Sequence, residues 1–251
     1  MSTTTVYSTK AEKYAKYRWD YAESALEAIF AITQLSSSSS VADLGAGTGI
    51  LTRHFVGKVK RIYAIEPNAE MRRVLSAGLG DYPRVSVLAG CAEATTLAQK
   101  SVDLITVAQA IHWFEPQLAR AEIMRVLKNR GWLAILRNYG IDEELNRATV
   151  GLMKAEYGAD FSVASARPAE KPISYYYGNE DFQKIIFPFQ FQQNWEEFIG
   201  ALISASYMPD ETNPLFKKLE NEARQIFSRY SIAGCLTVHG ETELFIGQPS
   251  I

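Results

Sequence analysis

Three glycines and one acidic residue are the part of this sequence whose types and spacing could do chemistry. Gly45, Gly47 and Gly49 follow directly after a short apolar run, which predicts a buried strand. Glycine permits a tight turn and the close approach of a ligand, because it has no Cβ. A second apolar run ends at Glu66, where a carboxylate can accept hydrogen bonds from both hydroxyl groups of a ribose. The pattern therefore predicts a site for a ligand that contains a nucleoside.

The spacing of the glycines distinguishes between two kinds of nucleoside ligand. A dinucleotide fingerprint, G-x-G-x-x-G, would need its third glycine at position 50, where the chain has Ile50. Here the glycines run G-x-G-x-G after Asp43, and a helix is predicted from Ile50 onward. This arrangement resembles the first motif of class I S-adenosylmethionine-dependent methyltransferases, D-x-G-x-G-x-G. The resemblance implies S-adenosyl-L-methionine as the cofactor, with contacts from Asp43, Gly45, Ala46, Gly47 and Glu66.

A corner with one unusual residue follows the third predicted strand. It reads Gly90-Cys91-Ala92-Glu93, where the methyltransferase family commonly has G-D-A-E with the Asp side chain on the adenine amino group. A thiol is a poor hydrogen-bond acceptor, so we expect the adenine to contact backbone groups around Ala92 beside Cys91. A reactive nucleophile at Cys91 is the less favoured interpretation, because no neighbouring residue supplies a base.

The stretch after the fourth predicted strand reads A-Q-A-I-H-W-F, from Ala108 to Phe114. Together with the later E-I-M-R-V-L-K-N-R-G, it is similar to the small-molecule "type 11" branch of these methyltransferases, which includes the trans-aconitate methyltransferases. The resemblance places Gln109 at the cofactor. His112 is the candidate for a catalytic base or a substrate contact, and a core or surface histidine without function is the alternative. Trp113 is expected in the pocket wall or the core.

Two arginines are candidates to bind a carboxylate of the substrate or of the methionine moiety. They are Arg18 in the N-terminal segment and Arg137 after the fifth predicted strand, and solvated surface arginines are the alternative. A carboxylate acceptor is ionised at neutral pH and needs no base, whereas a hydroxyl acceptor would need one, such as His112. We favour the carboxylate, which would give a methyl ester. No His, Cys and carboxylate cluster has the spacing of metal ligands, so no metal is expected.

Apolar runs alternate with helical patterns along the chain, which is typical of an α/β fold. The methyltransferase resemblance implies a doubly wound, seven-stranded, mostly parallel sheet of order 3-2-1-4-5-7-6, with the last strand antiparallel and helices on both faces. We expect a single methyltransferase domain over 1–251, with an N-terminal helical flap over 1–35 and an irregular insertion over 137–180 near the substrate mouth. The predicted strands lie at 41–44, 61–65, 85–88, 102–107, 132–136, around 186–191 and at 236–246.

Composition limits the class of protein. The chain has 251 residues, 47% of them apolar, and a net charge of −2, so a sizeable core is possible and no basic face indicates nucleic acid. It has only two cysteines, no signal-like N-terminus and no apolar run long enough for a membrane span, so we expect a cytoplasmic protein with a small-molecule substrate. The oligomeric state stays open. Two alternative functions are a cofactor-binding protein without catalysis and an NAD-dependent oxidoreductase, which Ile50 disfavours.

Overall fold

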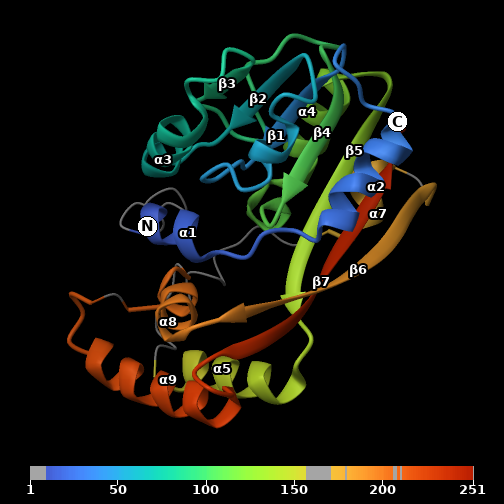
Figure 1. Ribbon diagram of the computed structural model, residues 1–251. Helices are drawn as coiled ribbons and strands as arrows, with labels where there is room; N and C mark the ends of the chain where they lie inside the picture. Colours follow the sequence, from blue (N-terminus) through green and yellow to red (C-terminus); the bar gives the residue numbers. More distant parts are fainter. Residues whose placement is uncertain (1–9, 157–170, 179, 206–207, 210, 251) are drawn as a thin grey trace.

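A single seven-stranded sheet organises the protein (Figure 1). The computed structural model describes residues 10–156, 171–178, 180–205, 208–209 and 211–250. The strand order is β3-β2-β1-β4-β5-β7-β6; β1 to β5 pair in parallel, and β7 runs antiparallel to both β5 and β6. The predicted fold class and strand order are therefore confirmed. The strands are β1 Ser40–Leu44, β2 Arg61–Ile65, β3 Val85–Leu88, β4 Val102–Ala108, β5 Leu127–Gly140, β6 Phe182–Gln193 and β7 Leu236–Gly247.

Helices cover both faces of this sheet, and side-chain caps fix where several of them begin. Asn68 accepts hydrogen bonds from the backbone N–H groups of the first turn of α3, and Glu115 does the same for α4. Asn194 and Glu197 form the capping box of α8 that their spacing indicates. The helices are α1 Ala11–Tyr17, α2 Glu23–Thr33, η1 Thr52–Phe55, α3 Ala69–Leu79, η2 Ile111–Trp113, α4 Pro116–Val126, α5 Glu143–Glu156, α7 Ile173–Tyr177, α8 Trp195–Ile203 and α9 Phe216–Tyr230.

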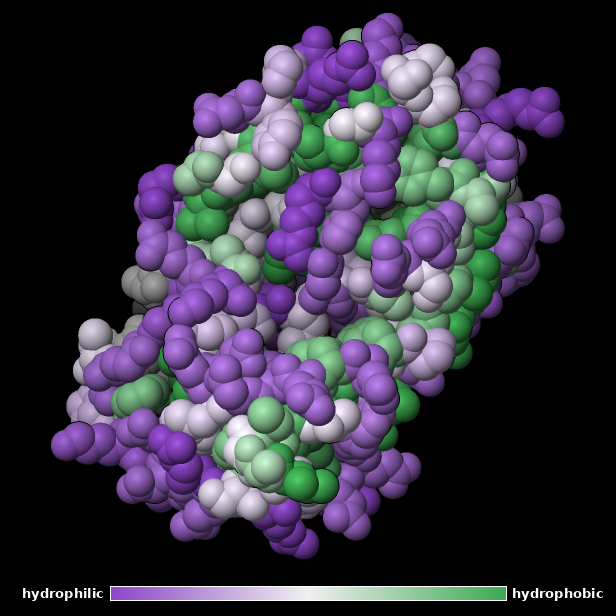
Figure 2. Space-filling view, viewed as in Figure 1, coloured by the Kyte–Doolittle hydropathy of each residue, from purple (hydrophilic) through white to green (hydrophobic). Residues whose placement is uncertain are grey.

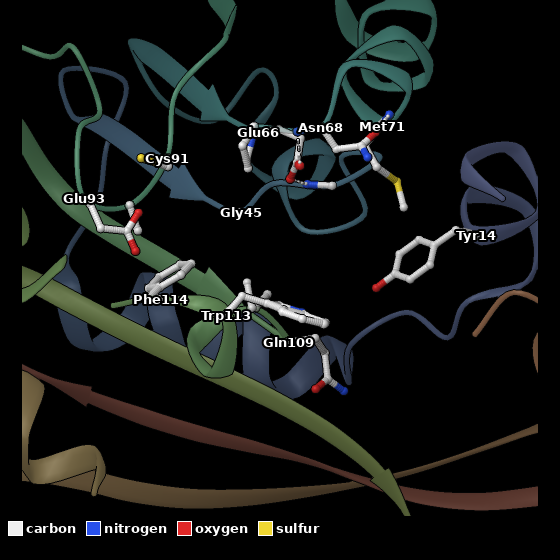
Figure 3. A pocket seen from close by; sticks show the side chains of 15 residues that line it. Tyr14, Gly45, Glu66, Asn68, Met71, Cys91, Glu93, Gln109, Trp113 and Phe114 are labelled. Carbon is white, nitrogen blue, oxygen red and sulfur yellow. Dashed lines mark hydrogen bonds between the residues drawn. The ribbon is translucent and has the colours of Figure 1, made fainter. Parts of the chain in front are cut away.

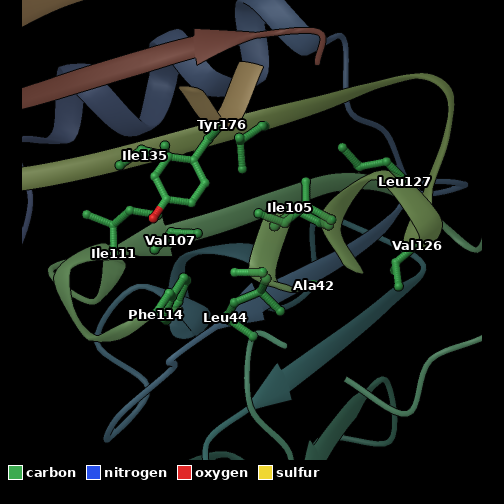
Figure 4. Close-up of a cluster of buried hydrophobic side chains, with 14 of the residues drawn as sticks. Ala42, Leu44, Ile105, Val107, Ile111, Phe114, Val126, Leu127, Ile135 and Tyr176 are labelled. Atoms are coloured by element: carbon green, nitrogen blue, oxygen red, sulfur yellow. The ribbon is translucent and has the colours of Figure 1, made fainter. Parts of the chain in front are cut away.

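The two faces of the sheet bury separate apolar clusters. On one face, Ile105 and Val107 of β4 pack with Tyr176 of α7 (Figure 4). Ile123 of α4 belongs to the same cluster. On the other face, side chains of α2 such as Ile29 pack against β1, β4 and β5. Each large apolar side chain that becomes fully buried contributes about 1.5–3 kcal/mol, so the two clusters hold the parallel part of the sheet rigid.

A third apolar cluster lies beyond the end of the sheet, in what we call the helical lobe: α5, α8 and α9. Leu145 of α5, Phe198 of α8 and Leu219 of α9 are all buried there, together with Leu236 at the start of β7. In Figure 1 the lobe lies below the sheet, connected to it through the long strands β5, β6 and β7. The N-terminal helix α1 packs against both α8 and α3, so it lies between the lobe and the sheet.

The prediction of a helix from Ile50 onward is wrong. Only the four-residue 3₁₀ helix η1, Thr52–Phe55, forms after the glycine loop. Val56 already has an extended backbone, and Gly57 follows with φ of +77°. With β2 starting at Arg61, too few residues remain to continue a helix.

The boundary between α4 and β5 also differs from the prediction. The helix ends at Val126 and the strand begins at once at Leu127, five residues before the expected start at Trp132. A register shift between Val102 and Leu104 of β4 accommodates this early start. The strand then continues to Gly140, where an irregular insertion was expected.

Within 137–180, where an irregular insertion was expected, the structure has regular elements. The first residues of this range belong to β5, and α5 and α7 follow. The expectation of irregular backbone is wrong for these elements, while residues 157–170 lie outside the described residues. Of the expected flap over 1–35, α1 lies apart from the sheet, whereas α2 packs on the sheet as part of its core. Only α1 keeps the character of a flap, and its covering role stays a prediction.

Candidate functional site

A cavity of about 310 Å³ opens at the carboxyl ends of β1, β2 and β4 (Figure 3). Its walls come from α1, the glycine loop, the turn after β2, the corner after β3 and the segment after β4. In Figure 3, Glu66 and Trp113 lie on opposite sides of the cavity, and the hydroxyl of Tyr14 points into it. Open α/β sheets bind ligands at this place, beside the strand where the order reverses. The topology alone thus marks it as the candidate site.

Glycine is required at two positions of the loop for different reasons. Gly45 has φ of +69°, and a Cβ built on it would come within 2.6 Å of the Cβ of Ala110. Gly47 has φ of +58° and lines the cavity, and a Cβ there would meet no protein atom within 4 Å. The first glycine therefore allows close packing inside the protein. The second leaves its backbone open to a ligand.

Glu66 is held in place by the backbone on both sides of it. Its Oε2 accepts a hydrogen bond from the N–H of Gly47 (2.8 Å), and its Oε1 accepts one from the N–H of Asn68 (2.8 Å). Burial raises the pKa of this carboxyl, against the opposing effect of these bonds and of Arg72. Each carboxylate oxygen has a second lone pair. Glu66 can therefore still accept hydrogen bonds from a ligand in the cavity that it lines.

Asp43 does not line the cavity, although a direct cofactor contact was predicted for it. It is 1% exposed, and its carboxylate accepts hydrogen bonds from Thr52 Oγ1 (2.6 Å) and Thr106 Oγ1 (2.9 Å). These bonds connect β1 to η1 and to β4 beneath the glycine loop. Ala46 is likewise buried, in a small cluster with Leu75. Both residues support the loop from behind, and neither is placed to contact a ligand in the cavity.

The burial of Asp43 predicts a pH-dependent stability. Burial raises the pKa of its carboxyl to about 6, despite the two threonine hydroxyls. Because the pKa is higher in the folded protein, Asp43 stabilises the fold below its unfolded pKa of about 4, and this contribution is lost as the pH rises through about 6. We expect the uncharged variant Asp43→Asn to gain about 3 kcal/mol relative to the wild type between about pH 4 and pH 7. Urea denaturation at several pH values measures the free energy of unfolding of both proteins. A difference between them that does not change with pH would contradict the raised pKa of Asp43.

The corner after β3 brings a carboxylate into the cavity beside Cys91. Cys91, Ala92 and Glu93 all line the wall, and Glu93 Oε1 accepts a hydrogen bond from the N–H of Glu115 (2.7 Å). Burial and a hydrogen bond to Glu93 raise the pKa of the Cys91 thiol, so it stays protonated and is a poor nucleophile. The acidic residue two positions after Cys91 was the sequence signal for this acceptor, although no contact was assigned to Glu93.

The segment after β4 supplies the wall opposite Glu66. Gln109 lines the cavity with φ of +55°, and its Nε2 donates to the carbonyl of Asn138 on β5 (2.7 Å). Trp113 also lines the wall, but His112 does not; its ring centroid lies 5.1 Å from that of Trp113. The catalytic role of His112 stays a prediction, and its position outside the wall does not favour it.

Neither predicted carboxylate-binding arginine lines this cavity. The guanidinium of Arg18 lies 5.1 Å from the ring centroid of Tyr14, a residue that does line it. Arg137 lies 5.9 Å from the ring centroid of Phe245 on β7. Their roles toward a substrate stay predictions, and only Arg18 is a neighbour of the wall.

Besides Glu93, several residues of the wall had no predicted ligand contact, among them Tyr14, Asn68 and Met71. Tyr14 comes from α1, and Asn68 and Met71 come from the start of α3. The helix-capping pattern marked the start of α3, directly after Glu66, and was the available signal for Asn68. Nothing in the pattern around Tyr14 distinguished it from Tyr17.

The part of the chain that the structure describes has neither a metal cluster nor a membrane-spanning helix. Within it, no group of three or more His, Cys, Asp or Glu side chains could hold a metal ion. None of the helices described there is both long and apolar enough to cross a membrane.

Comparison with known proteins identifies the central part of the chain. Residues 42–135 match the family model described as a methyltransferase domain. These residues are similar to methyltransferase domains. An uncharacterized methyltransferase of Mycobacterium tuberculosis is 42% identical over 103 residues, which are 41% of each chain. An uncharacterized methyltransferase of Schizosaccharomyces pombe is 35% identical over 133 residues, 53% of this chain and 52% of the relative. The match thus spans about two fifths to half of these relatives.

Solved structures resemble this region together with most of the remaining chain. A candidate type II methyltransferase of Anaeromyxobacter dehalogenans has a TM-score of 0.61 at 18% identity, over 93% of this chain and all of that one. The YcgJ protein of Bacillus subtilis has a TM-score of 0.58 at 19% identity, over 92% of this chain and all of that one. At this identity the likeness supports the fold alone.

Proposed function

We propose that this protein transfers a methyl group from S-adenosyl-L-methionine to a small molecule. The observation that carries the proposal is the Glu66 carboxylate, bonded to the N–H of Gly47 at the edge of the cavity. It joins the glycine loop to the end of β2, at the place where an acidic side chain binds ribose hydroxyls. The site belongs to a methyltransferase domain in a sheet of order 3-2-1-4-5-7-6.

The residues present fit this cofactor. Glu66 would accept hydrogen bonds from the ribose, and the open backbone at Gly47 would admit the methionine part. The corner at Ala92 would hold the adenine, with the Glu93 carboxylate as an acceptor for its amino group. When bound, the cofactor supplies an electrophilic methyl group: the acceptor's lone pair forms the new bond to carbon, and the electron pair of the carbon–sulfur bond stays on sulfur.

The protein's own contribution is to position the reactants and to exclude water. Displacement at a methyl carbon needs the acceptor atom held in line, and fixed geometry of this kind can supply much of the rate enhancement. Trp113 and Phe114 form an apolar wall opposite Glu66, and Gln109 is fixed by its bond to β5.

The acceptor is proposed at two levels. The proposal that the acceptor is a small molecule is supported by the modest size of the cavity. It is also supported by the net charge of −2, because a protein that binds nucleic acid usually has a basic face. A carboxylate that becomes a methyl ester is the finer proposal, together with the likeness to trans-aconitate methyltransferases. We also propose a cytoplasmic location, because the chain has only two cysteines, too few for a disulfide framework. The alternatives are a binding protein without catalysis and an NAD-dependent enzyme.

Calorimetric titration separates these functions. We expect S-adenosylmethionine and S-adenosylhomocysteine to bind, and NADH not to bind, because the glycine loop lacks the third glycine of the dinucleotide pattern. Formation of S-adenosylhomocysteine on addition of an acceptor would distinguish an enzyme from a binding protein. Binding of NADH in place of S-adenosylhomocysteine would refute the proposal.

A further inference from the structure

A second cavity, of about 250 Å³, lies between the end of α1 and the helical lobe. Residues of β5, α5, α8 and β7 line it, together with Arg18 and Trp19. The space-filling view shows the surface hollowed between the part that carries β1 to β4 and the helical lobe (Figure 2). The cavity is partly open to solvent, and Val150 in its wall is 40% exposed. Small ligands can therefore enter it.

The wall of the second cavity is mainly apolar. Leu145, Phe198 and Leu202 belong to the buried cluster of the lobe and also face this space. Such a wall suits the apolar body of a ligand, with a few polar groups to orient it. The volume is below the range of about 300–1,000 Å³ that is typical of sites for drug-sized ligands. A compact acceptor, or part of one, is the natural occupant.

Three ionisable side chains also line this cavity, and two of them pair with each other. The Nδ1 of His239 lies 3.2 Å from Oδ1 of Asp142. Arg18 forms no ion pair with a carboxylate among the described residues; its guanidinium lies over the ring of Tyr14. The positive charge of Arg18 therefore stays available to an anion in the cavity.

A thin wall separates this space from the cofactor cavity. Tyr14 lines the first cavity and Arg18 the second, and the guanidinium of Arg18 lies 5.1 Å from the ring centroid of Tyr14. The two cavities have no lining residue in common, but their walls are also close in sequence on β5: Gln109 of the first cavity bonds to Asn138, two residues before Gly140 of the second. The two cavities are therefore neighbours at the contact between Tyr14 and Arg18.

We propose that the second cavity binds the methyl acceptor, a small carboxylic acid with an apolar body. The apolar body lies against the helical lobe, and Arg18 holds the carboxylate at the junction with the cofactor cavity. An ionised carboxylate carries no proton to remove, so no base is needed beside Arg18. This inference rests on the proposed function, because it assigns the first cavity to the cofactor.

The test uses octanoic acid and octanol as probes, titrated calorimetrically into the full chain saturated with S-adenosylhomocysteine. We expect octanoic acid to bind and octanol to bind much more weakly. Arg18→Met removes the charge but keeps the length of the side chain, and should weaken octanoic acid binding about ten- to hundredfold, as expected for a charge-assisted hydrogen bond. Ala201→Phe places a ring in the cavity from α8 and should weaken it at least about tenfold by occupying the space.

Arg229→Met is the matched control. Arg229 lies 5.4 Å from the ring centroid of Tyr230 on α9, the same kind of stacking as at Arg18, but outside the second cavity. It should leave octanoic acid binding unchanged. Thermal melting and S-adenosylhomocysteine affinity of each variant report whether the fold and the first site remain intact.

The outcomes separate the two proposals. Failure of the wild type to bind S-adenosylhomocysteine would refute the proposed function itself. If S-adenosylhomocysteine binds but octanoic acid does not, or if neither Arg18→Met nor Ala201→Phe weakens its binding, the second cavity is not the acceptor site. Equal binding of octanol and octanoic acid would refute the carboxylate and the role of Arg18.

Discussion

Gly45→Ala is expected to lower the free energy of unfolding by about 2–5 kcal/mol and to abolish most cofactor binding. The left-handed backbone at this position, with φ of +69°, costs a residue with a side chain about 1–2 kcal/mol. The added Cβ would also lie 2.6 Å from the Cβ of Ala110, and overpacking of this kind costs about 1–3 kcal/mol. Both groups line the cofactor cavity, so any shift that relieves the clash displaces its wall. Urea denaturation and titration with S-adenosylhomocysteine measure the two effects.

Gly57→Ala separates the backbone strain from the clash. Gly57 has φ of +77°, close to that of Gly45, but a Cβ there would meet nothing within 4 Å. It also lies outside the cavity wall. We expect this variant to lose only about 1–2 kcal/mol and to bind the cofactor normally. Equal losses of stability and affinity in the two variants would show that the contact with Ala110 is not what requires glycine.

The second large effect is expected at Glu66, where Glu66→Ala should weaken cofactor binding at least about tenfold. One charge-assisted bond to a ribose hydroxyl is worth about 1.5–3 kcal/mol. The substitution also leaves the N–H groups of Gly47 and Asn68 without their acceptor, at about 1–3 kcal/mol for each group that stays buried. We therefore expect a loss of stability as well, because these two bonds connect the glycine loop to the start of α3. Calorimetry and urea denaturation on the same variant measure both quantities.

Glu70→Ala is the control for Glu66. Glu70 lies on the first turn of α3 and pairs with Arg73 at the surface, 2.9 Å apart. Surface pairs of this kind contribute about 0–1 kcal/mol, and Glu70 does not line the cavity. Cofactor affinity should be unchanged in this variant. If Glu66→Ala binds S-adenosylhomocysteine as well as Glu70→Ala does, Glu66 is not a ribose ligand.

The sequence was sufficient to predict the features that depend only on residues close to each other in the chain. Backbone conformation and hydrophobic period are local properties, so the glycine loop, Glu66 at the end of β2 and the capping box of α8 were all predictable. The strand order came from the resemblance to methyltransferases, and the sheet confirms it. Boundaries were less accurate: the step from α4 to β5 at Leu127 depends on pairing with β4, which the local pattern does not contain.

Side-chain placement around the site depended on the tertiary structure. Asp43 looked like a cofactor ligand in the motif, but Thr106, 63 residues away, helps to hold its carboxylate beneath the loop. Arg18 and His112 were both candidates to face a substrate, yet the packing of α1 and η2 leaves both outside the cofactor cavity. The segments packed against a side chain decide whether it lines the cofactor cavity or lies outside it. Those segments are distant in the chain and meet only when the sheet and the helical lobe assemble.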